Sequence, residues 1–184
     1  MNESLFFRRH SKRAFLDRPV PEESLQRIFE IIRWSPSCNN NQPWRFVFVT
    51  DYDSKAAFAE GLARGNEWAA AAPVLIAVCA RPEDDYNRQD DPVQYHQFDC
   101  GLAVMSLLLA AVDEGLMAHA MAGYDALKIK EALDIPGDYH VIAVIAMGYE
   151  GSIDQLDERT RAKDQTERTR KPIAEIISRD RFDF

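Results

Sequence analysis

The stretch PVLIAVCA, residues Pro73 to Ala80, is a near-continuous run of apolar side chains. Such a short run is typical of a β-strand that is covered on both faces of its sheet. A second run of this kind, HVIAVIAM, occupies residues His140 to Met147. We therefore expect Pro73–Ala80 to be a central strand and His140–Met147 to be another buried strand.

The segments around these two strands alternate between helix-like and strand-like patterns. One of them carries apolar residues at Leu25, Ile28, Phe29 and Ile32, which is the spacing of an amphipathic helix. Comparable patterns predict helices at 21–34, 54–63, 93–114 and 125–133, and short strands at 45–50 and 117–121. The alternation predicts one α+β domain over residues 1–184, with helices flanking a mixed central sheet.

The composition is that of an acidic globular protein. The 184 residues are 46% hydrophobic and 28% charged, and the formal net charge is −8. Nucleic acids and anionic membranes are themselves negatively charged, so they favour partners with an excess of Lys and Arg. We expect neither of them as the main partner.

The sequence predicts no targeting or membrane-spanning segment. The first apolar residues are followed at once by Arg8 and Arg9, which does not fit the apolar core of a signal peptide. The longest apolar run, Cys100 to Val112, is too short to cross a bilayer and predicts a buried helix. The three cysteines show neither disulfide-framework nor zinc-ligand spacing. We expect a cytoplasmic protein.

Three polar clusters stand out from this acidic background. They are RRHSKR at 8–13, SPSCNNNQPW at 35–44 and RTRKP at 168–172. Taken singly, each is typical of a solvated face or a turn. Taken together they suit a phosphate-bearing heterocycle. A guanidinium group can bind two phosphate oxygens at once, and amide side chains can form hydrogen bonds with the polar atoms at the edge of a ring.

The order of the motifs along the chain resembles that of a known family. Nearly the whole chain is covered, in this order, by RRHSKRAF, WSPSCNNNQPWRF, GNEW before APVLIAV, DCGLAVMSLLLAA, AGYD, GYE and RTRKP. These motifs resemble the FMN-dependent nitroreductase family. The resemblance implies a nitroreductase-like fold, bound FMN, NADH or NADPH as the electron donor, and a homodimer with FMN at the subunit interface.

The resemblance also implies two sets of contacts at the phosphate end of FMN. The N-terminal motif would hold the phosphate and the ribityl chain through Arg9, Ser11 and Arg13, with His10 beside them near the flavin ring. The second set, Arg168 and Arg170, would come from the C-terminal tail. On this interpretation the basic N-terminal segment forms an anion-binding site.

Further contacts are implied at the flavin ring. A loop of the other subunit would touch the ring and the ribityl hydroxyls through Pro36, Ser37, Cys38, Asn40 and Gln42. Asn66 would contact the pyrimidine side of the ring, and the backbone N–H of Gly123 would approach the reactive nitrogen N5. Many relatives carry Glu where this chain has Ala122, so the surroundings of the substrate differ here.

Two regions lack a helix or strand pattern. The acidic stretch 80–92 predicts a surface loop that is a candidate for a mobile cover, and it is short beside the helical insertions of larger relatives. After Gly148 the chain carries many charges and few large apolar residues, until Ile173, Ile176 and Ile177 restore an apolar stripe. We expect about 150–184 to form an extended tail that wraps a partner subunit.

The resemblance implies electron transfer by a ping-pong mechanism. NAD(P)H would reduce the flavin at N5 and leave, and an electron-poor nitroaromatic, quinone or activated alkene would then take the electrons. No side chain is expected to act as a catalytic nucleophile, and no metal is expected. His96 could lie near the substrate loop, but a lone histidine on a helix is more often structural, and we interpret it so. We interpret His119 and His140, which lack metal-ligand spacing, as structural residues as well, and Asp99 as a residue that caps or pairs within the long helix.

Three other functions remain open at this point. The chain could be a specialised member of the family, either a dehydrogenase acting on a peptide-derived ring or a flavin-cleaving enzyme. It could bind flavin without reductase turnover, in which case it would not oxidise NAD(P)H. It could also be an acidic interaction module whose basic ends contact a partner protein, which predicts a colourless protein.

Overall fold

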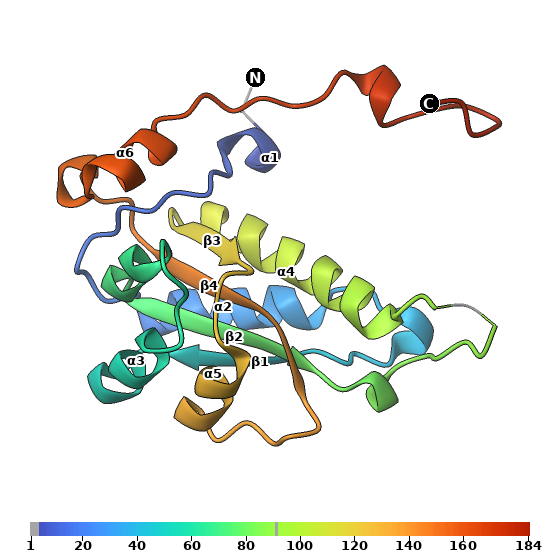
Figure 1. Cartoon of the computed structure of the whole chain (residues 1–184), viewed down its shortest axis with the longest axis horizontal. Helices are drawn as coiled ribbons and strands as arrows, with labels where there is room; N and C mark the ends of the chain where they lie inside the picture. Colours follow the sequence, from blue (N-terminus) through green and yellow to red (C-terminus); the bar gives the residue numbers. More distant parts are fainter. Residues whose placement is uncertain (1–3, 91) are drawn as a thin grey trace.

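β2, Val74–Ala80, is the interior strand that the apolar run predicts. In the computed structural model, which describes residues 4–90 and 92–184, β2 lies between β1, Arg45–Val49, and β4, His140–Gly148 (Figure 1). β3, Met117–Met121, pairs with the other edge of β4. Every residue of β2 is buried, so this strand is covered on both faces.

The strand directions differ from the mixed sheet that the sequence predicts. Each of the three pairings between the described strands is antiparallel. The segment between β1 and β2 contains the short helix α3, Tyr52–Ala59, but the chain re-enters the sheet at the end where it left, because Val49 is paired with Leu75. A helix between two strands therefore did not imply a parallel crossover here. The α+β class is confirmed, and the expectation of a mixed sheet is wrong.

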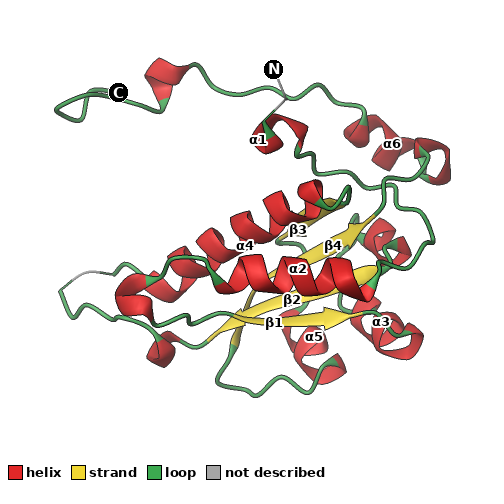
Figure 2. Cartoon of the chain, turned by 180° about the vertical axis from the view of Figure 1, so that it is seen from behind, coloured by secondary structure: helices red, strands yellow, loops and turns green. Residues whose placement is uncertain are grey.

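Helices cover both faces of the sheet. α2, Glu22–Arg33, and α4, Tyr95–Asp113, pack on the face to which β2 contributes Val74, Ile76 and Val78 (Figure 2). α3 and α5, Ala126–Ala132, lie on the opposite face, where the intervening β2 residues are buried with Phe58 and Ile129. The pleat of a single strand thus supplies two hydrophobic cores.

α4 is the longest helix, and it ends at the predicted glycine. Gly115 has a φ of 72°, and its N–H donates to the carbonyl of Val112 at 3.1 Å. The N–H of Leu116 donates to the carbonyl of Ala111 at 2.7 Å, which completes a Schellman cap. This cap turns the chain directly into β3.

α4 also has the length and apolar composition of a membrane span. The helix has 19 residues, so it extends beyond the apolar run that was expected to be too short. Nearly half of the relevant window is buried inside the fold, where Ala103 and Leu107 belong to the core between α2 and the sheet. A place in the core accounts for this composition without a membrane.

Three aspartates determine where shorter helices begin. The carboxylates of Asp51 and Asp125 accept hydrogen bonds from the first-turn amides of α3 and α5, from Ser54 at 2.9 Å and from Leu127 at 3.0 Å. Asp157 caps α6, Glu158–Asp164, through the amide of Thr160 at 3.1 Å. α6 gives regular structure to the charged segment that follows β4, where the sequence predicts only an extended tail.

The segment that begins at residue 5 and the segment that follows α6 run close together over one end of α4. α1, Leu5–Arg8, packs there, and Arg8 Nη2 donates to the carbonyl of Val112 at 3.3 Å. Figures 1 and 2 show the chain after α6 passing α1 and continuing beyond the body of the fold. Ile173, Ile177 and Phe182 are exposed on this segment. The remaining 3-10 turns are Cys38–Asn40, Glu67–Ala71, Pro82–Asp84, Ile153–Gln155 and Ile173–Glu175.

Candidate functional site

The first and third polar clusters meet in one cationic cavity. The cavity has a volume of about 190 Å³ and lies between the segment after α1 and the segment from α6 onward. Its lining consists of Arg9, His10, Ser11, Lys12, Arg13, Lys163, Asp164, Thr166, Arg168 and Arg170. The residues expected at the phosphate end of the ligand are therefore brought together, although more than 150 residues of sequence separate the two clusters.

A single buried carboxylate holds the two segments of this cavity together. Asp164, whose side chain is 1% exposed, accepts a hydrogen bond from the backbone N–H of Arg13 at 2.8 Å. The same carboxylate lies 3.7 Å from the Lys12 ammonium and 3.7 Å from the Arg13 guanidinium. Lys12 also pairs with Glu150 at 3.0 Å. These contacts dock the N-terminal segment on α6.

The cations of the cavity repel one another. Burial, together with the charges of Arg168 and Arg170, lowers the pKa of Arg9 below its ordinary value. Arg168 Nη1 donates to His10 Nε2 at 3.0 Å, and burial, followed by the charge of Arg168, lowers the pKa of His10. Entry of an anion would relieve this repulsion and would receive charge-assisted hydrogen bonds from the same groups.

An apolar groove opens from the cationic cavity along α4. This groove of about 860 Å³ is lined by Phe6, Phe7, Met105 and Leu108, and it shares four cationic or histidine residues with the cavity. The shared residues are Arg9, His10, Arg168 and Arg170. A ligand with an anionic group at one end and a flat apolar body could place the anionic group in the cavity and the apolar body in the groove.

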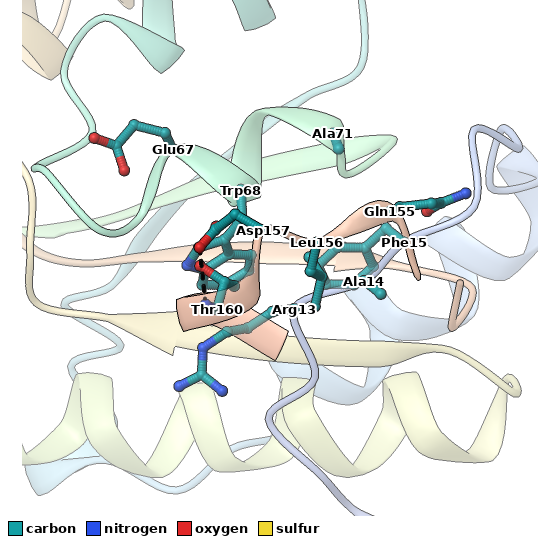
Figure 3. A pocket seen from close by; sticks show the side chains of 10 residues that line it. All are labelled: Arg13, Ala14, Phe15, Glu67, Trp68, Ala71, Gln155, Leu156, Asp157 and Thr160. Carbon is teal, nitrogen blue, oxygen red and sulfur yellow. Dashed lines mark hydrogen bonds between the residues drawn. The ribbon is translucent and has the colours of Figure 1, made fainter. Parts of the chain in front are cut away.

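Arg13 also forms part of the wall of a smaller second cavity. Figure 3 shows it beside Trp68 at this cavity of about 180 Å³, and its guanidinium carbon lies 5.8 Å from the Trp68 ring centroid. The Trp68 ring in turn packs against the ring of His119, with the two ring centroids 4.7 Å apart. His119 Nδ1 lies 3.0 Å from the carbonyl of Lys12, and burial lowers its pKa, so the histidine supports the N-terminal segment. The structural interpretation of His119 agrees with this position.

Asn66 and Gly123 are brought into direct contact. Asn66 Nδ2 donates to the carbonyl of Gly123 at 2.9 Å, and the N–H of Ala63 donates to the same oxygen at 3.1 Å. A Cβ atom on Gly123 would lie 2.6 Å from Asn66 Nδ2, so a larger residue there would displace this amide. Ala122 is exposed beside this contact. The amide of Asn66 therefore supports the turn around Gly123.

The predicted ring loop, residues 36–42, has an unusual backbone. Asn39, Asn40 and Gln42 have φ values of 49°, 59° and 50°, in the left-handed region that Asn tolerates better than most residues. The N–H of Gln42 donates to Ser37 Oγ at 3.0 Å, and its side-chain amide donates to the carbonyl of Asn40 at 3.0 Å. The asparagine-rich sequence is explained by these turns.

Side-chain exposure varies along the ring loop. Pro36 and Asn40 are exposed, whereas Ser37, Cys38 and Gln42 are partly buried. Burial, with smaller contributions from nearby carboxylates, raises the pKa of the Cys38 thiol. Trp44, which follows the loop, is buried in the core, as its interpretation as a packing residue predicts.

Within one chain the ring loop lies far from the cationic cavity. The backbone N–H of Cys38 donates to Asp99 in the second turn of α4 at 2.7 Å, whereas Arg8 contacts Val112 at the other end of that helix. Thirteen residues of helix separate these contacts, or roughly 20 Å at 1.5 Å per residue. The structure therefore unites the phosphate-end residues but does not bring the ring loop to them.

Several residues at these sites were missed in the sequence. Lys12 lies inside a predicted cluster and could have been included on its charge alone. Asp164 carries no comparable signal, because a single acid in a charged helix is ordinary. Asp99 was interpreted as a cap or partner within α4, but it bonds to the ring loop instead.

The chain is similar to proteins of one family. The sequence profile of the nitroreductase family matches residues 7–69 and 61–149. A Stenotrophomonas maltophilia (strain R551-3) protein, provisionally named an NADH dehydrogenase/NAD(P)H nitroreductase, is 33% identical over 147 residues, which cover 71% of this chain and 75% of that protein.

Two solved structures share the fold over nearly the full length of both chains. A crystal structure described as an oxidoreductase containing FMN has a TM-score of 0.88 and 34% identity, covering 100% of this chain and 93% of its own. A Desulfovibrio desulfuricans protein, provisionally classed as a nitroreductase and solved in complex with FMN, has a TM-score of 0.76 and 27% identity, with coverages of 97% and 96%.

Proposed function

This chain belongs to the nitroreductase family, and from that premise we propose that it is an FMN-dependent oxidoreductase that takes electrons from NADH or NADPH. The observation that carries the proposal is the continuity between the cationic cavity and the apolar groove, which share Arg9, His10, Arg168 and Arg170. FMN has the matching form, with a phosphate at one end and a planar ring at the other.

The cationic cavity would hold the phosphate. Arg9, Arg13, Arg168 and Arg170 supply positive charge, and Ser11 supplies a hydroxyl, within a cavity of about 190 Å³. Charge-assisted bonds to phosphate each contribute about 1.5–3 kcal/mol. Asp164 holds Lys12 and Arg13 in position beside the other cations of the cavity.

The ring contacts require a second copy of the chain. Pro36, Ser37, Cys38, Asn40 and Gln42 lie at the far end of α4 from the cavity, so one chain cannot place both sets on one FMN. A two-fold dimer would bring the ring loop of one protomer to the cavity of its partner and would form two equal sites. The exposed apolar residues of the C-terminal segment support a tail that embraces the partner subunit.

The chemistry would come from the cofactor. When bound, FMN would supply the redox chemistry that links hydride donation by NAD(P)H to reduction of a nitroaromatic, a quinone or an activated alkene in two half-reactions. The residues of this chain would orient the ring, exclude water and present the Gly123 backbone to the reactive edge. No nucleophilic side chain is needed, and the raised pKa of Cys38 keeps its thiol protonated at neutral pH.

The test is a visible absorption spectrum of the purified protein, recorded anaerobically before and after addition of NADH and then NADPH. The proposal predicts a flavin spectrum that bleaches with at least one donor. A flavin spectrum that neither donor bleaches would contradict the NAD(P)H oxidoreductase and leave a flavin-binding protein. A protein that stays colourless after incubation with FMN would contradict the proposal entirely.

A further inference from the structure

Trp68 lies where three segments of the chain meet. Its ring packs against Phe15 of the N-terminal segment and against His119 of β3, with ring centroids 6.3 Å and 4.7 Å apart. The Arg13 guanidinium carbon lies over the same ring, 5.8 Å from its centroid (Figure 3). At the edge of the ring, the indole N–H donates to the carbonyl of Gly65 at 3.0 Å. One side chain therefore contacts both an arginine of the cationic cavity and the turn at Gly65.

The face of the indole ring holds Arg13 without occupying its hydrogen-bond donors. In the part of the chain that the structure describes, the Arg13 guanidinium donates no hydrogen bond, and its ion pair with Asp164, at 3.7 Å, is longer than one. An arginine that lies on an aromatic face keeps its N–H groups free for a bidentate contact. The other arginines of the cavity each donate to an oxygen atom of the chain; they are Arg9, Arg168 and Arg170. Arg13 thus has its donors available for an anion.

The indole N–H acts on the turn that supports Gly123. The Gly65 carbonyl and the Asn66 N–H belong to one planar peptide group. The indole of Trp68 binds this carbonyl, and the N–H of Asn66 donates to the carbonyl of Ala63 at 2.9 Å, so both polar atoms of the peptide are held. The side chain of Asn66 then donates to the Gly123 carbonyl at 2.9 Å. Loss of the indole N–H would free one side of this peptide and loosen the contact with Gly123.

Trp34, at the end of α2, offers a comparison within the same chain. Its Nε1 donates to Glu30 at 2.9 Å, and the Arg33 guanidinium carbon lies 5.5 Å from its ring centroid. Trp34 is 76% exposed, and its two partners are not among the residues that line the cationic cavity. Trp68 makes the same two kinds of contact, but with residues of the candidate site. The partners of Trp68 therefore distinguish its role from that of an ordinary surface tryptophan.

We propose that Trp68 is a positioning residue for both ends of the FMN site. The face of its ring orients Arg13 for the phosphate, and its indole N–H holds the turn that supports Gly123 beside the flavin. This inference rests on the proposed function for its effect on FMN, whereas the two contacts belong to the chain itself and are tested without cofactor.

Two substitutions separate the two contacts. Trp68→Phe keeps an aromatic face but has no N–H, and Trp68→Met has neither. In the cofactor-free full chain, amide hydrogen exchange at Ala63 and Asn66 should become about fivefold faster in both variants, because the turn loses one hydrogen bond. The NMR signal of the Arg13 Nε–H should shift in Trp68→Met, which has no ring current, and much less in Trp68→Phe. Trp68→Leu replaces Trp68→Met should the latter fail to fold.

Two controls accompany these variants. Trp34→Met removes the same pair of contacts on α2 and should leave the exchange at Asn66 and the Arg13 signal as in the wild type. Arg13→Ala should leave the exchange at Asn66 unchanged, because the arginine lies on the face of the ring and not at its N–H. Unchanged exchange in Trp68→Phe, an unchanged Arg13 signal in Trp68→Met, or equal changes in Trp34→Met would overturn the inference.

The same proteins are then titrated with FMN. Trp68→Met should weaken binding by about tenfold, because Arg13 loses its orientation, whereas Trp68→Phe should stay within about threefold of the wild type. In an Arg13→Ala chain, Trp68→Met should weaken binding by less than about threefold, since the arginine that it positions is gone. A tryptophan that only fills space would cause the same loss in both backgrounds, and that result would overturn the inference.

The proposed function can fail separately from this inference. If every protein failed to bind FMN while the exchange rates and the Arg13 signal changed as predicted, the proposed function would be contradicted. Trp68 would then remain a support of Arg13 and of the turn at Gly65.

Discussion

The two ends of α4 are organised by opposite kinds of charge. Near Val112, cations from both ends of the chain surround a single buried carboxylate, Asp164, and repel one another. Near Asp99, two carboxyl groups hold an uncharged loop through hydrogen bonds. The first region gathers positive charge that suits an anion, whereas the second supports the loop by hydrogen bonds within the fold. Substitutions should therefore affect ligand affinity at the first end and loop shape at the second.

The largest effect is expected from removing cations at the first end. Arg9→Ala and Arg170→Ala should each weaken FMN binding by about 10- to 100-fold, since each loses one or more charge-assisted contacts worth about 1.5–3 kcal/mol. Arg33→Ala, which removes an exposed arginine paired with Glu30 on α2, is the matched control. Flavin fluorescence titration measures the change. Unchanged affinity in both site variants would refute the phosphate assignment.

Substitution of the carboxylate at the cationic end should separate stability from affinity. Asp164→Asn removes the charge that neutralises Lys12 and Arg13, so the free energy of unfolding should fall by about 1–3 kcal/mol. FMN affinity should hold or increase, because the phosphate then has no competing carboxylate. Urea unfolding and FMN titration give the two values. A parallel loss of both would show that Asp164 mainly shapes the cavity.

The contributions of Asp99 and Glu114 to the free energy of unfolding should depend on pH in opposite directions. Asp99 lies near the start of α4, and Glu114 follows its end. The bidentate contact with Arg27 lowers the pKa of Glu114 to about 2, so its stabilisation is present above about pH 4.5 and is lost as pH falls. The pKa of Asp99 is raised by burial, so its contribution is present below about pH 3.8 and is lost as pH rises through the raised value.

Urea unfolding across this pH range checks both signs. Glu114→Gln should remove part of the loss of stability at acid pH, and Asp99→Asn should remove part of the loss on the neutral side. Each variant serves as the control for the other, because both replace a carboxyl by an amide at α4. If both variants changed the free energy of unfolding over the same pH range, the predicted difference between the two ends of α4 would be contradicted.

The smallest effect concerns the cysteines. Burial raises the pKa values of Cys79 and Cys100 to about 11 and about 12, and both side chains are buried, so iodoacetamide should leave them unmodified in the native protein. Cys38 is partly exposed and should be alkylated slowly, with protection by FMN. Mass spectrometry locates the label. Labelling of Cys100 before Cys38 would show that the support behind the ring loop opens readily.

The core of the fold could be predicted because its signals are local. The apolar run of β2 and the position of Gly115 each follow from a few neighbouring residues. Strand direction depends on where the chain re-enters the sheet, and no short window contains that information, which is why the mixed sheet was wrong. The packing of α4 likewise explains its apolar composition better than its length does.

The candidate site also contains residues that could be predicted from the sequence and residues that could not. The cationic clusters at the two ends of the chain could be predicted as one site because a shared ligand requires both. Asp164, Asp85 and Asp99 could not, since their roles arise only from contacts across the fold with Arg13, Asn41 and Cys38. Acids are common in this chain, so nothing in their local sequence distinguishes these three from exposed ones.

The central claim is that one FMN is held by the cationic cavity of one protomer and the ring loop of its partner. The most direct test joins an Arg170→Ala chain and an Asn40→Gly chain, carrying different tags, in a heterodimer purified through both tags. Each parent homodimer should retain little FMN, whereas the heterodimer should contain one intact site and bind about one FMN per two chains. A heterodimer as empty as its parents would contradict the claim and place both residues in the site of a single chain.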